Sequence, residues 1–215
     1  MFQAVFDKVH ESFYALDAQS VSGRVIGTAF AISQGGILAT AMHVISGIDI
    51  SRSYLTKTMG QRRYFSFDIV ATEPAVDLAV LKLKDPDPQL SPVNISPNPA
   101  LYGQSVLAIG YPLTYRDLVQ QAECKPMLNA RVWGCTVASD MSFPPLDGSG
   151  GAKVEVFEVD TNLHPGMSGG PVVNRAGELV GVVSRAVMRP QNIEEPHLTV
   201  CVRSQHLASM LSKIA

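Results

Sequence analysis

The residues of this chain best suited to chemistry are one serine, one histidine and one aspartate. Ser168 stands among glycines in HPGMSGGPVV, residues 164–173, and a proline and an apolar segment follow directly. Glycine permits the tight turns in which a hydroxyl and the neighbouring backbone N–H groups point into an open cleft. The string therefore predicts a nucleophilic serine beside an oxyanion hole.

A serine hydroxyl needs a general base, and histidine is the usual one near neutral pH. Of the five histidines, His43 is the best candidate, because it follows the apolar run GILATA and a strand end can direct a side chain across a cleft. The base in turn needs an anion that holds its tautomer. Asp77 suits this role, because a lone acid that enters an apolar strand is costly to bury unless it is paired. Asp68 is the weaker alternative.

The elements that must position these residues are short strands. The 17 glycines and 14 prolines are scattered, which indicates many turns. Between them lie short apolar runs, which read as RVIGTAFAIS, GILATAMHVI, YFSFDIVATE, LAVLKL, SVLAIGYP, ARVWGCTVAS, KVEVFEVD, GPVVN, LVGVVSRAV and LTVCVRS. Runs of this length and spacing are typical of β-sandwiches and barrels. The sequence therefore predicts an all-β protein.

The terminal segments have helical spacing instead. We expect one helix over 1–19 and a second over 204–215. The first would place these apolar residues near one face: Phe2, Val5, Phe6, Val9, Phe13 and Leu16. The second would do the same with Leu207, Met210, Leu211 and Ile214. The proline-rich stretch 84–100 is expected to connect two lobes. The prediction is one domain over 1–215, with lobes at about 20–90 and about 100–203.

Composition excludes several classes of protein. The chain has 215 residues, 46% of them hydrophobic and 17% charged, which excludes intrinsic disorder. A net charge of -2 argues against a nucleic-acid partner, and no apolar run is long enough to span a membrane. The first twenty residues do not resemble a signal peptide, which favours a cytoplasmic location. Three cysteines without CxxC spacing, predicted to be reduced thiols, argue against zinc, so no metal and no cofactor is expected: Cys124, Cys135 and Cys201.

In chain order, His43, Asp77 and Ser168, within TAMHV, DLAVL and GMSGGPVV, resemble the trypsin-like serine proteases of the chymotrypsin fold. More narrowly, the chain is similar to the protease domain of the bacterial high-temperature-requirement type, without its peptide-binding domains. The resemblance covers about residues 20–212. It implies two antiparallel six-stranded barrels that meet at a cleft, with helices at the two ends of the chain. The first barrel would supply the histidine and aspartate, and the second the serine.

The resemblance also implies roles for single residues. His43 would be the general base, Asp77 its orienting acid and Ser168 the nucleophile, with the N–H groups of Gly166 and Ser168 as the oxyanion hole. Residues around the primary specificity pocket would be Asn162, Leu163, His164, Ser184, Arg185 and Ala186, of which Ser184 also supports the aspartate. This mapping puts no acid at the pocket base, which favours an uncharged or apolar P1 residue unless Asp160 turns inward.

The function that these residues favour is a serine endopeptidase that cleaves peptide bonds through an acyl-enzyme formed on Ser168. One alternative is a catalytically latent, protease-like binding or regulatory module that needs an activating partner. An esterase with the same triad is another. The expected partners are a polypeptide substrate and an activator or targeting protein. Met167 stands where secreted digestive members carry an aspartate, so their N-terminal activation switch is expected to be absent.

Overall fold

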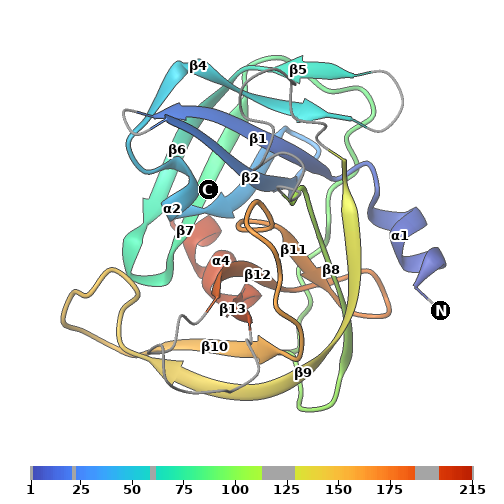
Figure 1. Cartoon of the computed structure of the whole chain (residues 1–215), viewed down its shortest axis with the longest axis vertical. Helices are drawn as coiled ribbons and strands as arrows, with labels where there is room; N and C mark the ends of the chain where they lie inside the picture. The colour runs from blue at the N-terminus through green and yellow to red at the C-terminus, as the bar shows by residue number, and fades with distance from the viewer. Residues whose placement is uncertain (1, 21–22, 59–61, 113–128, 187–198, 215) are drawn as a thin grey trace.

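The strands of the protein form two lobes, each built on one sheet, as the computed structural model shows (Figure 1). The structure describes residues 2–20, 23–58, 62–112, 129–186 and 199–214, except the side chains of residues 185 and 186. In Figure 1 the strands before residue 84 occupy one half of the molecule, and those after residue 104 the other. The all-β prediction is confirmed.

The first lobe is a seven-stranded antiparallel sheet. Its strands are β1 (Phe13–Ser20), β2 (Gly23–Ala31), β3 (Ile37–Ala41), β4 (Ile48–Lys57), β5 (Arg63–Phe65), β6 (Phe67–Glu73) and β7 (Leu78–Leu83). They pair in the order β5-β4-β1-β2-β3-β7-β6. This lobe is a curled half-barrel of seven strands, where the resemblance implied a barrel of six. The seventh strand arises because Ser66 divides one extended segment into β5, which pairs with β4, and β6, which pairs with β7 at the other end of the order.

The second lobe is a closed six-stranded barrel, as expected. Its strands are β8 (Ser105–Gly110), β9 (Arg131–Phe143), β10 (Val154–Val159), β11 (Pro171–Val173), β12 (Leu179–Ala186) and β13 (Thr199–Arg203). They pair in the order β10-β13-β12-β11-β8-β9, and the ring closes between β9 and β10. Closure gives each strand two neighbours, so the barrel has no open edge.

The N-terminal helix is shorter than predicted, because α1 covers only Gln3–Val9 and the residues of β1 after it are extended. Phe13 and Leu16 have helical spacing, but the two residues between them are buried as well. β1 lies between β2 and β4 with core on both of its faces, so burial shows no period of two. β4, which is mostly exposed along its first half, was also missed.

The other helices are short. α2 (Met42–Ile45) follows β3, the 3-10 helix η1 (Pro74–Val76) precedes β7, and α4 (Ser204–Ser212) lies within the predicted C-terminal helix and packs on β12. Leu207 and Met210 are the apolar residues that α4 buries. Among the described residues, no helix is both long and apolar enough to cross a lipid bilayer.

One hydrophobic core joins the two lobes. Phe13, Phe30 and Val80 from the first lobe pack in the same buried cluster as Ile109 and Val182 from the second. Each lobe also has a smaller core of its own. Burial of apolar surface contributes roughly 25 cal/mol of folding free energy for each Å² removed from water. A shared core therefore holds the lobes in one arrangement. The site between them is therefore set by packing.

The proline-rich connector is attached to the first lobe through a buried acid. Asp87 accepts a hydrogen bond from Tyr14 Oη at 2.7 Å and pairs with Lys57 Nζ at 2.8 Å and Arg63 Nη1 at 3.1 Å. Burial alone would raise the pKa of Asp87, but the hydrogen bonds from Lys57 and Tyr14 outweigh it and hold the pKa below its usual value. The carboxylate thus stays charged and fixes the connector.

Candidate active site

Asp77 occupies a strained backbone position at the end of η1. Its φ of 54° is the only left-handed value of a non-glycine residue in the described chain. The position is held because the Asp77 N–H donates to the Pro74 carbonyl at 3.1 Å and the Asp77 carbonyl accepts from the Met42 N–H at 3.0 Å. Such strain persists only where the surrounding structure over-determines it. Asp77 therefore lies at the edge of β7, directly before its first residue, as its sequence context suggested.

His43 lies directly against this acid. It is the second residue of α2, where the chain turns after β3, and its backbone N–H donates to Asp77 Oδ1 at 2.9 Å. The imidazole Nδ1 is 2.8 Å from Asp77 Oδ2. A carboxylate at Nδ1 places the ring proton there, so Nε2 of neutral His43 is the nitrogen left to accept a proton.

The carboxylate of Asp77 has the environment of a permanent anion. Asp77 is only 3% exposed. Burial works to raise the pKa of Asp77, but the hydrogen bonds from His43 and Ser184 and the attraction of His43 outweigh it, and the pKa lies below its usual value. The Ser184 hydroxyl donates to Asp77 Oδ2 at 2.5 Å. Asp77 thus orients His43 and can stabilise an imidazolium.

Ser168 comes from the other lobe and is partly exposed between Met167 and Gly169. Its hydroxyl donates to the backbone carbonyl of Ser184 at 3.1 Å. Within the described chain, no hydrogen bond joins Ser168 Oγ to His43. The structure therefore brings all three predicted residues to one site, where Ser184 contacts both the acid and the nucleophile.

A tight turn precedes the nucleophile. The Met167 N–H donates to the His164 carbonyl at 3.1 Å, and Gly166 has a φ of 93°. These are the marks of a type II turn, in which proline suits the second position and glycine the third. Neither the Gly166 N–H nor the Ser168 N–H donates to any residue that the structure describes. Two unpaired donors beside a nucleophile are what an oxyanion hole needs.

The glycines after the nucleophile are required by close packing. A Cβ on Gly169 would collide with the Thr28 carbonyl and the Thr40 hydroxyl, and one on Gly170 with the Ile109 carbonyl. The Gly169 φ of 82° also disfavours any side chain there. The two glycines thus let the nucleophile turn lie directly on both lobes.

Sequence reasoning missed Thr28 on β2, which links the nucleophile turn to the first lobe. The buried Thr28 hydroxyl donates to the Gly166 carbonyl at 2.8 Å and accepts from the Tyr111 N–H at 3.0 Å. The Thr28 N–H donates to the Ser168 carbonyl at 2.9 Å. The only available signal was a polar residue inside the apolar run VIGTAFA, and such a residue has many ordinary explanations.

The residues predicted around the specificity pocket are only partly described. Leu163 is buried, and its N–H donates to the Thr199 hydroxyl at 2.9 Å. Asn162 and His164 are exposed, and the His164 ring lies 5.8 Å from that of Trp133. The side chains of Arg185 and Ala186 lie outside the described part. Which of these residues contact a substrate stays a prediction.

Two other acids were considered in the sequence, Asp68 as the partner of His43 and Asp160 as an acid at the base of the specificity pocket, and the structure shows both in other contacts. Asp68 is exposed and forms an ion pair with Lys84 at 3.0 Å, so it is not the partner of His43. Asp160 Oδ1 accepts a hydrogen bond from the N–H of Thr136 on β9 at 2.7 Å.

The prediction of reduced thiols agrees with Cys135 and Cys201, which are buried and free, while Cys124 lies outside the described residues.

Comparison with known proteins gives a family and a fold. Residues 27–182 match the family described as "Trypsin-like peptidase domain". A protein of Marinomonas sp. named "Probable periplasmic serine endoprotease DegP-like" is 32% identical over 165 residues, which cover 76% of this chain and 30% of that protein. One of the same name from Pseudomonas savastanoi is 30% identical over 164 residues, with the same coverage. The matched part of this chain thus spans only 30% of the length of these relatives.

Solved structures support the fold independently. The active form of the Rv3671c protease from M. tuberculosis superposes with a TM-score of 0.77 at 21% identity, covering 98% of this chain and 84% of that one. The structure of the HtrA-type protease AlgW with a tripeptide superposes with a TM-score of 0.76 at 20% identity, covering 100% of this chain and 64% of that one. At these identities the likeness concerns the fold alone. The chymotrypsin-like fold expected from the motifs is confirmed.

The predicted cytoplasmic location is wrong by the same comparison. Relatives from Marinomonas and Pseudomonas are named periplasmic. The prediction rested on the first twenty residues, and a targeting segment is recognised only where the sequence being read contains it. Since this chain corresponds to about 30% of each of these relatives, its first residues carry no information about a leader.

Proposed function

This chain belongs to the trypsin-like peptidase family, and from that premise we propose that it is a serine endopeptidase with Ser168, His43 and Asp77 as its catalytic triad. The observation that carries the proposal is the Asp77 carboxylate. It is buried, ionised and bound to His43 Nδ1 at 2.8 Å, next to a serine whose turn has unpaired N–H groups. Membership in the family implies polypeptide substrates.

The proposed first step is acylation. His43 Nε2 removes the proton of Ser168 Oγ as the oxygen attacks the carbonyl carbon of the scissile bond. The resulting oxyanion accepts hydrogen bonds from the N–H groups of Gly166 and Ser168. The imidazolium is stabilised by Asp77 and then protonates the leaving amine, so that the C–N bond breaks and an ester remains on Ser168.

The proposed second step is hydrolysis of that ester. His43 removes a proton from water, and the hydroxide attacks the acyl carbon in the same oxyanion hole. Collapse of the intermediate returns the proton to Ser168 Oγ and releases the acid product. The protons move among Ser168, His43, the leaving amine and water, so Asp77 stays ionised throughout, as its lowered pKa favours.

For specificity, we propose an uncharged or apolar P1 residue, with Asn162, Leu163, His164, Ser184, Arg185 and Ala186 around the pocket. The engagement of Asp160 with Thr136 supports this proposal, because it leaves that acid in a structural contact. The names of the relatives support a periplasmic location. An activator or targeting protein stays part of the proposal as a partner.

The test of the proposal is labelling by a fluorophosphonate probe, which reacts with an activated serine. We expect the wild type to be labelled and Ser168→Ala and His43→Ala to lose labelling, with unchanged circular dichroism. Folded wild-type protein that stays unlabelled, both purified and in native lysate, would contradict the proposal. Comparison of amide and ester hydrolysis then separates a peptidase from an esterase.

A further inference from the structure

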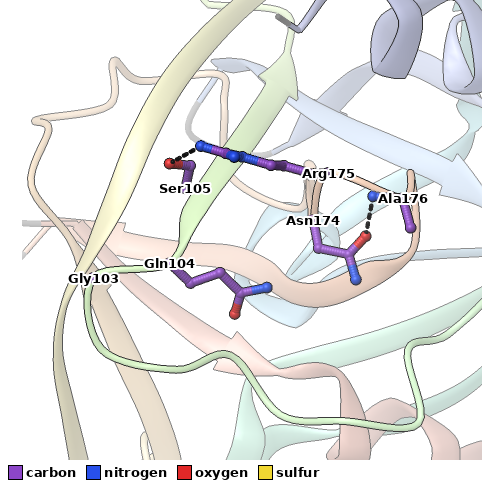
Figure 2. Close-up of a pocket in the computed structure, with 6 residues that line it drawn as sticks. All are labelled: Gly103, Gln104, Ser105, Asn174, Arg175 and Ala176. Atoms are coloured by element: carbon purple, nitrogen blue, oxygen red, sulfur yellow. Dashed lines mark hydrogen bonds between the residues drawn. The ribbon is translucent and has the colours of Figure 1, made fainter.

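A polar cavity lies on the second barrel, and none of its residues belongs to the site described above. It has a volume of about 460 Å³ and is lined by two short segments, which are Gly103, Gln104 and Ser105, and Asn174, Arg175 and Ala176. The first segment leads into β8 and the second joins β11 to β12. Figure 2 shows the side chains of Gln104, Asn174 and Arg175 around this space.

Each side-chain oxygen of this cavity already accepts at least one hydrogen bond from the protein. Gln104 Oε1 accepts the Leu101 N–H at 2.9 Å. Asn174 Oδ1 accepts the N–H groups of Ala176 and Glu178 at 2.9 and 3.0 Å. Because backbone N–H groups can only donate, these bonds fix which side of each amide is oxygen. Ser105 Oγ accepts from Arg175 Nη2 at 3.1 Å.

What remains unused is a set of donors. Gln104 Nε2 keeps both of its N–H groups, and Asn174 Nδ2 keeps one, since the other is donated to Glu178 Oε2 at 2.9 Å. The exposed Arg175 guanidinium has five N–H groups, and Ser105 is its only hydrogen-bond partner in the described chain. Within the same residues, no carboxylate lies within ion-pair distance of Arg175. A cationic recess in which the unused donors outnumber the unused acceptors fits an anionic ligand.

The turn that leads to the lining residues Gly103 and Gln104, here called the rim, carries two exposed apolar residues. Leu101 and Tyr102 are 65% and 67% exposed, the highest fractions among the large hydrophobic residues that the structure describes. They stand on a tight turn closed by the Gln104 N–H and the Leu101 carbonyl at 3.0 Å, with Gly103 at a φ of 72°. Tyrosine and arginine are both enriched in binding hot spots. Tyr102 adjoins the lining residue Gly103, and its hydroxyl donates to the Asp140 carbonyl at 3.1 Å. A small inorganic anion would leave this rim uncovered.

We propose that this cavity binds a carboxylate of a polypeptide, held by Arg175, Gln104 and Asn174, with an apolar residue next to it packed on Leu101 and Tyr102. The planar guanidinium matches a carboxylate with two parallel hydrogen bonds. The carboxylate is that of a C-terminus or of an acidic side chain, and both present the same two oxygens. The site anchors a peptide segment away from Ser168, so it does not depend on the proposed catalysis.

The test measures binding in the Ser168→Ala background, where no peptide is cleaved. Fluorescence anisotropy is followed with three labelled hexapeptides, which are Gly-Ser-Gly-Ser-Leu-Phe with a free C-terminus, the same peptide as its C-terminal amide, and an amide with Glu before Leu-Phe. The variants are Arg175→Gln and Gln104→Glu. Arg52→Gln, which removes the same charge from an exposed position on β4, is the matched control.

We expect saturable binding of the free-carboxylate peptide, of the Glu-containing amide, or of both, which identifies the source of the carboxylate. Arg175→Gln and Gln104→Glu should each weaken it about tenfold or more, because charge-assisted hydrogen bonds are lost or opposed. Arg52→Gln should bind as the parent does. The proposal is overturned if neither carboxylate peptide binds, if the plain amide binds equally well, or if Arg175→Gln has no effect.

Discussion

The hydroxyl of Ser168 donates its hydrogen bond to the backbone carbonyl of Ser184, 3.1 Å away. The side-chain hydroxyl of the same Ser184 donates to Asp77. One residue of β12 therefore holds the nucleophile through its backbone and the acid through its side chain. Ser168 must rotate about its Cα–Cβ bond toward His43 before it can attack.

Ser184→Ala separates these two contacts, because it removes the bond to Asp77 and keeps the carbonyl that accepts from Ser168. A hydrogen bond to a charged group contributes roughly 1.5–3 kcal/mol, so we expect kcat/KM to fall about tenfold or more. The measurement is steady-state hydrolysis of a peptide amide substrate. Ser184→Thr, which keeps a hydroxyl, is the control, and equal activity of Ser184→Ala and wild type would show that Ser184 does not support Asp77.

Asp77→Asn tests whether the acid sets the tautomer of His43. The variant keeps the shape of the side chain, but the amide can donate a hydrogen bond to Nδ1 and so move the imidazole proton to Nε2, the nitrogen that must act as base. We expect kcat to fall about 10⁴-fold. Asp68→Asn, at the exposed alternative position, should leave kcat unchanged. A large loss of kcat in Asp68→Asn but not in Asp77→Asn would instead assign the orienting role to Asp68.

Thr28→Val tests the contact between the lobes at the oxyanion turn. The variant removes the hydroxyl that donates to the Gly166 carbonyl and accepts from the Tyr111 N–H. We expect kcat to fall about tenfold, with a smaller change in KM, because the turn that carries the Gly166 N–H loses a hydrogen bond that holds it on the first lobe. Thr28→Ser keeps the hydroxyl and should restore most of kcat. If the two variants are equally impaired, packing and not the hydrogen bond is the cause.

Asp87→Asn tests the acid that fixes the connector. The pKa of Asp87 is lower in the folded protein than its usual value of 3.8. A lowered folded pKa means that ionised Asp87 stabilises the fold above the unfolded pKa, and that this contribution is lost as pH falls through the folded pKa. Removing the charge leaves Lys57 partly unpaired, so we expect a loss of roughly 3 kcal/mol of unfolding free energy at pH 7.

Urea denaturation measures this loss, and Asp68→Asn is the control variant. Urea denaturation of wild type and Asp87→Asn should show a difference in unfolding free energy that narrows below about pH 4. Asp68→Asn breaks an ion pair with Lys84 in which both side chains are largely exposed, and it should change stability by less than about 1 kcal/mol. A difference for Asp87→Asn that does not depend on pH would exclude the charge as its source.

The sequence by itself singled out His43, Asp77 and Ser168, which the structure brings together, because each lies in a short string that can be interpreted without the rest of the chain. Gly169 and Gly170 stand out in the same string as Ser168, but the contacts that exclude a Cβ there come from distant residues, which are Thr28, Thr40 and Ile109. The strands of the second barrel were predicted for a similar reason, because their apolar runs are local and are separated by turn residues.

Tertiary structure decided the remainder. β1 was predicted as helix because residues buried on both faces of a strand have no period of two, and which faces are covered depends on β2, β4 and the second lobe. The bond from Thr28 to Gly166 joins residues 138 positions apart, and that from Ser168 to Ser184 depends on where the barrel puts β12. Such contacts are set by the packing of the lobes, which no local pattern of side chains encodes.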